Sequence, residues 1–125
     1  MVSSLSVTSE AYLYLKIRFG VRDHSGEDDA LIDTGFTGHL AIPASWQARL
    51  GTPDGYSQWI LADGSIFHAP VYLGGVEIVG LSLIPAATIV VVGDEYILGR
   101  RVLDRRVLDR YEITLDHGQR VIVRL

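Results

Sequence analysis

Residues 30–38 read ALIDTGFTG, an apolar run that leads directly into an aspartate followed by turn residues. The apolar residues 30–32 can anchor the loop in the core while Asp33 points into a cleft. The hydroxyl of Thr34 can brace the loop by hydrogen bonding to the backbone, and Gly35 lets another chain approach closely. Taken alone, Asp-Thr-Gly is more simply an Asx-turn that reverses the chain in a β-protein.

Two later segments give this loop a context. Ala62-Asp63-Gly64-Ser65 separates the apolar runs 56–61 and 66–73, and an Asp-Gly pair between two such runs favours a β-hairpin. Further along, Ile97-Leu98-Gly99-Arg100 opens a predicted helix over 100–110, in which Arg-Val-Leu-Asp-Arg occurs twice in succession.

The remaining pattern is one of short strands separated by glycine, aspartate and proline, which is typical of an all-β protein. We predict one domain over residues 1–125, with turns at 24–28 and 74–75. A short helix is predicted at 43–50, with proline near its start and Gly51 just past its end. The other strands are expected at 11–19, 30–32, 39–42, 76–84, 88–92, 112–115 and 120–125.

The three segments, in this order, resemble the retropepsin-like aspartic proteases, the retroviral-type family with single-domain bacterial members. The resemblance spans about residues 12–125. It implies an all-β, closed-barrel acid-protease fold with one lobe per chain and a flap, a hairpin that closes over the cleft. The implied activity is that of an aspartic endopeptidase acting on a peptide or protein substrate.

The same resemblance assigns roles to residues. Asp33 is implied as the catalytic aspartate, supported by Thr34 and Gly35. Contacts to substrate are implied for Phe36, Ala62, Asp63, Gly64, Ser65 and Ile97. Structural roles near the site are implied for Leu98, Gly99 and Arg100.

Two features depart from the family pattern. Viral enzymes often carry an acidic residue shortly after the active glycine, which pairs with the arginine after the second glycine. Here Phe36-Thr37-Gly38 occupies that stretch, so Arg100 needs another partner. The second Arg-Val-Leu-Asp-Arg block resembles an insertion, because one copy suffices to join Gly99 to Tyr111.

The chemistry of aspartic proteases needs two carboxyl groups that share a proton. The chain has one suitable loop, so the second Asp33 is expected from another copy across a twofold axis. The active loop and the apolar end Val121–Leu125 are the expected contacts, because an unpaired apolar strand needs a cover. The alternative is that this strand pairs within its own chain.

Other functions remain open on the sequence. A catalytically inactive dimerisation or peptide-binding module could keep the fold, although the intact Asp33, Thr34 and Gly35 favour the peptidase. A small-molecule-binding β-barrel explains the strands and leaves the Ile-Leu-Gly-Arg segment unexplained. Trp59 is predicted to pack at the base of the flap, with a place in the cleft as the alternative.

The bulk composition excludes several classes. The chain has 125 residues, a net charge of −4 and no cysteine, so disulfide and thiolate chemistry are impossible. A mildly acidic chain argues against nucleic acid as a partner, and no apolar run is long enough to span a membrane. Histidines lack metal-ligand spacing, so we expect no metal and no cofactor. Without a recognisable signal or pro-segment, a cytoplasmic location is expected.

Overall fold

The structure is a computed structural model that describes residues 6–33, 35–60, 63–81, 83–99, 102, 112–116 and 119–124. Its strands are β1 (Ser6–Ser9), β2 (Tyr14–Val21), β3 (His24–Ile32), β4 (Leu40–Ile42), β5 (Gly55–Ile60), β6 (Ile66–Ile78), β7 (Leu83–Val91), β8 (Ile97–Leu98), β9 (Glu112–Asp116) and β10 (Arg120–Arg124). A 3-10 turn at Ala44–Trp46 leads into the short helix α1 (Gln47–Leu50).

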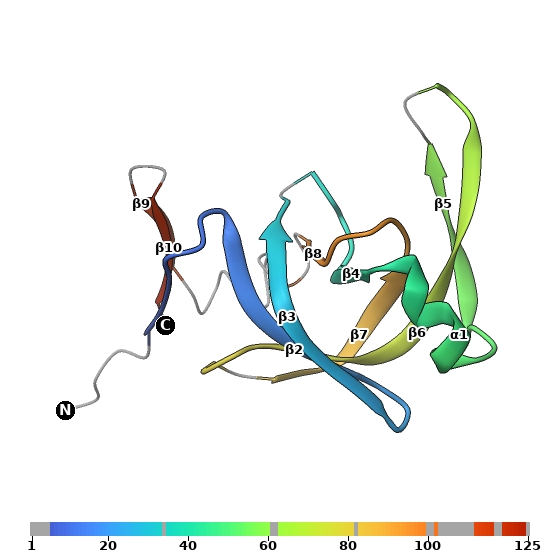
Figure 1. The fold of residues 1–125 in the computed structure, drawn as a ribbon, viewed down its shortest axis with the longest axis horizontal. Helices are drawn as coiled ribbons and strands as arrows, with labels where there is room; N and C mark the ends of the chain where they lie inside the picture. The colour runs from blue at the N-terminus through green and yellow to red at the C-terminus, as the bar shows by residue number, and fades with distance from the viewer. Residues whose placement is uncertain are drawn as a thin grey trace.

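Six strands close into a barrel. The strand order is β2-β3-β8-β4-β7-β6-β5, and a further pairing of β2 with β6 joins the two sides of the sheet. Strand β5 lies outside this closure and is attached through β6, so the β5–β6 hairpin projects from the barrel (Figure 1). This architecture confirms the predicted all-β fold with a closed barrel and a hairpin.

The barrel interior follows from the alternation of side chains along its strands. In β2 the residues Leu15, Ile17, Phe19 and Val21 are buried, while the residues between them face outward or lie at the rim. A strand with period two therefore places one apolar face inward. Burial of each large apolar side chain contributes about 1.5–3 kcal/mol, so this face holds β2 against the rest of the barrel.

The turn predicted at 24–28 is wrong, because β3 already begins at His24 and the chain reverses at Arg22-Asp23. Arg22 has φ 56°, in the left-handed region. Gly26 pairs opposite Phe19, and a Cβ there would lie 2.7 Å from the Phe19 ring. Close packing of the aromatic core over the strand explains the glycine, which the sequence alone suggested to be a turn residue.

The turn predicted at 74–75 is also wrong. Strand β6 runs through both glycines, with a register shift between Gly74 and Val76. A Cβ on Gly74 would overlap the carbonyl oxygen of Gly20, so the glycine permits β2 and β6 to approach and close the barrel. The chain reverses instead at Val79-Gly80, where Gly80 has φ 93°. The strand predicted at 76–84 is therefore divided between β6 and β7.

Other boundaries follow the predictions more closely. The strands near 39–42 and 88–92, the helix at 43–50 and the hairpin around 62–65 are all present. The strand expected at 11–19 begins instead at Tyr14, because residues 10–13 turn the chain and Tyr14 N–H donates to the Ala11 carbonyl at 2.6 Å. The predicted helix at 100–110 lies outside the described residues, apart from Val102, which is buried.

A second, three-stranded sheet joins the two ends of the chain. Its order is β1-β10-β9, and it lies to one side of the barrel (Figure 1). Both neighbours of β10 come from the same chain, and Val121 and Val123 are fully buried. The apolar C-terminal strand is therefore covered within its own chain, which corrects the expectation that it needs a partner as cover. None of the described helices is long and apolar enough to cross a membrane.

Candidate active site

Asp33 follows the last residue of β3 and is fixed by the strand beside it. Strands β3 and β8 run parallel, with Ile32 opposite Leu98. The N–H of Asp33 donates to the Leu98 carbonyl at 3.0 Å, which extends this pairing one residue beyond the strand. The Asp33 side chain is exposed. The loop backbone is thus held rigidly while the carboxylate stays accessible.

A tight turn completes the loop. Gly35 N–H donates to Asp33 Oδ1 at 2.9 Å, and Phe36 N–H donates to the Asp33 carbonyl at 3.2 Å. The first of these bonds is that of an Asx-turn. The Asx-turn and the active loop, which the sequence presented as alternatives, are therefore compatible in one geometry. Thr34 lies outside the described residues.

The second predicted segment crosses directly behind the loop. Strand β8 lies between β3 and β4, and Gly99 N–H donates to the His39 carbonyl at 2.9 Å. A Cβ on Gly99 would overlap the carbonyl oxygen of Gly38 and lie 2.6 Å from Phe36 Cδ2. This crossing leaves no space for a side chain, which explains the glycine of Ile-Leu-Gly.

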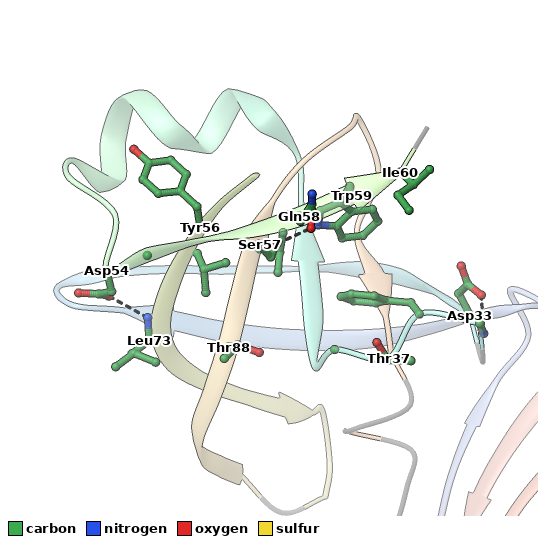
Figure 2. A pocket seen from close by; sticks show the side chains of 16 residues that line it. Asp33, Thr37, Asp54, Tyr56, Ser57, Gln58, Trp59, Ile60, Leu73 and Thr88 are labelled. Atoms are coloured by element: carbon green, nitrogen blue, oxygen red, sulfur yellow. Dashed lines mark hydrogen bonds between the residues drawn. The ribbon is translucent and has the colours of Figure 1, made fainter. Parts of the chain in front are cut away.

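Beside the loop lies a cavity of about 850 Å³, bounded on its other side by β5 (Figure 2). The rings of Phe36 and Trp59 meet across it with centroids 5.5 Å apart. Trp59 therefore lines the cavity, which was the alternative for this residue. Its pairing with Phe67, next to the last pair before the turn, corrects the predicted position at the base of the hairpin. The lining comprises Asp33, Gly35, Phe36, Thr37, Gly38, Asp54, Gly55, Tyr56, Ser57, Gln58, Trp59, Ile60, Val71, Leu73, Thr88 and Val90.

The predicted site residues separate into three groups. Asp33, Gly35 and Phe36 come together at the cavity. Leu98 and Gly99 are buried behind the loop, and Ile97 lies in β8 outside the cavity lining. Asp63, Gly64 and Ser65 lie at the exposed turn of the hairpin and do not line the cavity. Ala62 and Arg100 lie outside the described residues, so their predicted roles stay predictions.

The β5–β6 hairpin has a regular register that ends with Ile60 opposite Ile66. At its turn, Asp63 Oδ1 accepts hydrogen bonds from the Ser65 hydroxyl at 2.6 Å and the Ser65 N–H at 2.9 Å. These bonds lower the pKa of Asp63. Ile60, Ile66 and Phe67 are all exposed near this end, so apolar surface accompanies a locally ordered turn.

Several cavity residues were missed by the sequence reasoning. Ser57 is one of them. It alternates with exposed neighbours along β5, in phase with Trp59, whose place in the cleft was an alternative prediction, and this period-two pattern was the available signal for an inward face. Val71, Thr88 and Val90 come from β6 and β7, which the pairing of those strands brings under the hairpin. No local sequence pattern predicts that these residues line the cavity, because their position depends on long-range strand pairing.

Thr88 also links the cavity to the loop. Its N–H donates to His39 Nδ1 at 3.2 Å, and its hydroxyl lies 3.1 Å from the same nitrogen. Since a backbone N–H can only donate, Nδ1 acts as the acceptor and this hydrogen bond needs that nitrogen unprotonated. His39 therefore contacts β7 through its ring and Gly99 through its backbone carbonyl, which accepts the Gly99 N–H.

Asp54 lies at the opposite end of the cavity from Asp33 (Figure 2). Its Oδ2 accepts the Leu73 N–H at 2.9 Å, and its Oδ1 accepts Arg22 Nη2 at 3.2 Å. The Leu73 N–H, followed by the Arg22 charge, lowers the pKa of Asp54. Among the described residues, no group of three or more side chains has the composition of a metal site.

The chain is similar in structure to a retropepsin-like aspartic protease from Rickettsia conorii. The TM-score is 0.58, and the likeness covers 98% of this chain and 92% of that chain, at 14% sequence identity. No protein-family model and no curated protein sequence matches the chain. The likeness confirms the predicted retropepsin-like fold, and at this identity it carries the fold alone.

Proposed function

We propose that the protein is an aspartic endopeptidase that acts as a homodimer, with one Asp33 from each chain. The observation that carries the proposal is the placement of Asp33. An exposed carboxylate lies on a backbone-fixed loop at one end of a cavity, inside a retropepsin-like fold. Each chain supplies one such loop, and the chemistry requires two carboxyl groups.

The proposed reaction is hydrolysis of a peptide bond by a water molecule held between the two Asp33 carboxyl groups. One carboxylate takes a proton from the water while the other, protonated, donates a hydrogen bond to the scissile carbonyl. Two carboxylates held this close cannot both ionise easily, so they titrate as a coupled pair. The loop contributes by fixing each Asp33 before substrate arrives, because its backbone bonds to Leu98 and Phe36 are intramolecular.

The fold also bears on how two chains would meet. Strand β10 has a neighbour from its own chain on each side, so it has no edge to share with a partner. Strands β1 and β9 each end the three-stranded sheet and are paired on one side among the described strands. We therefore propose that the partner contacts the Asp33 loop and the outer edge of β1 or β9.

The hairpin β5–β6 is proposed to act as the flap. It is paired to the barrel only through β6, and β5 is an edge strand. Closure over a bound peptide would bring Trp59 and the exposed Ile60 toward the substrate and exclude water from the site. In solution, hydrogen exchange should be faster at residues 56–60 than in β2.

The test is cleavage of a denatured protein or peptide mixture by the wild type, Asp33→Asn and Asp94→Asn. We expect Asp33→Asn to lose cleavage at least a thousandfold and to remain folded by circular dichroism, because it removes the shared proton site. Asp94 is exposed and outside the cavity, so Asp94→Asn supplies the same charge change as a control. Retention of wild-type cleavage by Asp33→Asn would exclude the proposed mechanism.

The dimer has its own measurement. Specific activity should fall steeply on dilution if two chains form one site, and sedimentation should show the dimer at the active concentrations. A monomer that cleaves with first-order dependence on enzyme concentration contradicts the shared site. Peptide binding without any cleavage would instead support the non-catalytic binding module.

A further inference from the structure

The cavity continues far beyond Asp33, and its distant end carries a negative charge. All six residues of β5 line it, from Ile60 to Gly55, and Asp54 follows at the end of the row (Figure 2). An extended chain rises about 3.3 Å per residue, so β5 spans about 17 Å. A substrate peptide lying extended along this cavity would reach Asp54 about five residues from the bond held at Asp33.

The charges of the lining are of one sign. Among the described residues, sixteen line the cavity; Asp33 and Asp54 are the charged ones, and none of the sixteen is a lysine or arginine. Between the two carboxylates the lining is aromatic, aliphatic or neutral and polar. A peptide would therefore pass over an uncharged middle section and meet a carboxylate at the outer end.

Asp54 retains the capacity to bind a further donor. A carboxylate offers about four acceptor positions, and the described residues use two of them, through Leu73 N–H and Arg22 Nη2. The Asp54 side chain is 38% exposed. Arg22 lies outside the lining and also donates to the Leu50 and Thr52 carbonyls at 2.8 Å each. Arg22 thus contacts Asp54 from outside the cavity and compensates the charge of Asp54 only in part.

We propose that the outer end of the cavity is a subsite for a lysine or arginine of the peptide substrate, with Asp54 as its anionic contact. The inference rests on the proposed function, because it takes the cavity to be the substrate cleft. In a symmetric dimer each end of the cleft would carry one Asp54. Basic residues should then be favoured on both sides of the cleaved bond, at about equal distance from it.

The preference should be moderate. Ion pairs between partly exposed side chains contribute about 0.2–1 kcal/mol, which corresponds to about a 1.4- to fivefold effect on binding. The neighbouring guanidinium of Arg22 weakens the attraction further. Removal of Arg22 should therefore strengthen the selection of basic residues, whereas removal of the Asp54 charge should abolish it.

The experiment measures binding separately from cleavage. Full-length Asp33→Asn protein is immobilised and incubated with a randomised decapeptide library, and the retained peptides are sequenced by mass spectrometry. The same selection is repeated with Asp54→Asn, Arg22→Gln and Asp94→Asn, each added to Asp33→Asn. The Asp94→Asn addition matches the charge change at an exposed position outside the cavity.

We expect about 1.4- to fivefold enrichment of lysine and arginine over glutamate. The enrichment should be lost with Asp54→Asn, increased with Arg22→Gln and unchanged with Asp94→Asn. If Asp54→Asn and Arg22→Gln merely disturbed the fold, each would reduce the retention of basic and acidic peptides alike. Equal enrichment with Asp54→Asn, or no retention of any peptide, overturns the inference. If the wild type cleaved no peptide while the enrichment was still observed, the proposed catalysis would be excluded and the proposed subsite would stand.

Discussion

The two walls of the cavity are built on different principles. On one side, the Asp33 loop is tied by backbone hydrogen bonds to Leu98 and backed by the crossing of Gly38 and Gly99, where no side chain fits. On the other side, β5 is an edge strand whose attachment is to β6. A reacting group needs a fixed position, whereas a wall that admits and covers a peptide has to move. The contrast predicts that substitutions in the packed backing of the loop, such as Gly99, cost stability, whereas substitutions on the hairpin side cost mainly function.

The largest expected effect on stability is that of Gly99→Ala. The added methyl group would overlap the Gly38 carbonyl oxygen and the Phe36 ring, and the overlapping backbone cannot rotate away. We expect a loss of about 3 kcal/mol in the free energy of unfolding, at the upper end of overpacking costs. Denaturation with urea measures it, with Gly55→Ala as the matched control.

Gly55 lies in β5 on the hairpin side, and a Cβ there meets no atom within 4 Å. The control should change the free energy of unfolding by less than about 0.5 kcal/mol. Equal losses for Gly99→Ala and Gly55→Ala would show that the two walls do not differ as proposed.

On the hairpin side, Trp59→Ala should separate function from stability. It removes the contact with the Phe36 ring at 5.5 Å and the cross-strand pairing with Phe67. Aromatic pairs of this kind contribute about 0.5–1.5 kcal/mol, so we expect a loss of about 1 kcal/mol in the free energy of unfolding. If the hairpin is the flap, kcat/KM should fall by a larger factor than this stability change requires.

Tyr56→Ala provides the comparison for Trp59→Ala on the same strand. Tyr56 also borders the cavity, but it is 66% exposed and alternates out of phase with Trp59 along β5. Its removal should change the free energy of unfolding by less than about 0.5 kcal/mol. A Trp59→Ala protein with full kcat/KM would argue that the hairpin wall has no part in substrate binding.

Gly64→Ala should have a smaller effect, and for a different reason from that of Gly99→Ala. A Cβ on Gly64 meets nothing within 4 Å, but its φ of 84° lies in the left-handed region. Alanine in that region costs about 1 kcal/mol, and the cost falls on the hairpin turn. Gly64→Asn should be tolerated better than Gly64→Ala, because asparagine enters this region more readily. Urea denaturation of both variants checks this order.

The sequence predicted the wall formed by the Asp33 loop better than the wall formed by β5. ALIDTG and Ile-Leu-Gly are short patterns in which each residue has a local reason, and the structure places them side by side. The glycines at 26 and 74 were misread as turn residues, since their cause is close packing against Phe19 and Gly20 from another strand. Such contacts depend on which strands pair, and no window of sequence contains that information.

Cavity residues from β6 and β7 were missed for the same reason. Val71, Thr88 and Val90 looked like ordinary strand residues, and their place at the cavity follows from the pairing of their strands. Asp54 lies between a helix and an edge strand and belongs to no motif. Its place at the cavity depends on the Leu73 N–H and on Arg22, which hold its carboxylate and come from distant parts of the chain.

The smallest expected effect concerns the pH dependence of stability at Asp54. The Leu73 N–H and Arg22 lower its pKa below the ordinary value of 3.8, so the folded protein favours the carboxylate more than the unfolded chain does. This contribution is therefore fully present above pH 3.8 and is lost as the pH falls through the lower folded pKa. The difference in free energy of unfolding between wild type and Asp54→Asn should shrink over that acidic window.

Because the ion pair between Asp54 and Arg22 is exposed, high salt should weaken the contribution of Arg22 and leave the contribution of the Leu73 N–H. A difference that is constant from neutral pH to well below 3.8 would mean that Asp54 stabilises the hairpin base by shape and hydrogen bonding rather than by charge. The negative charge of Asp54 would then act on a ligand in the cavity rather than on the stability of the fold.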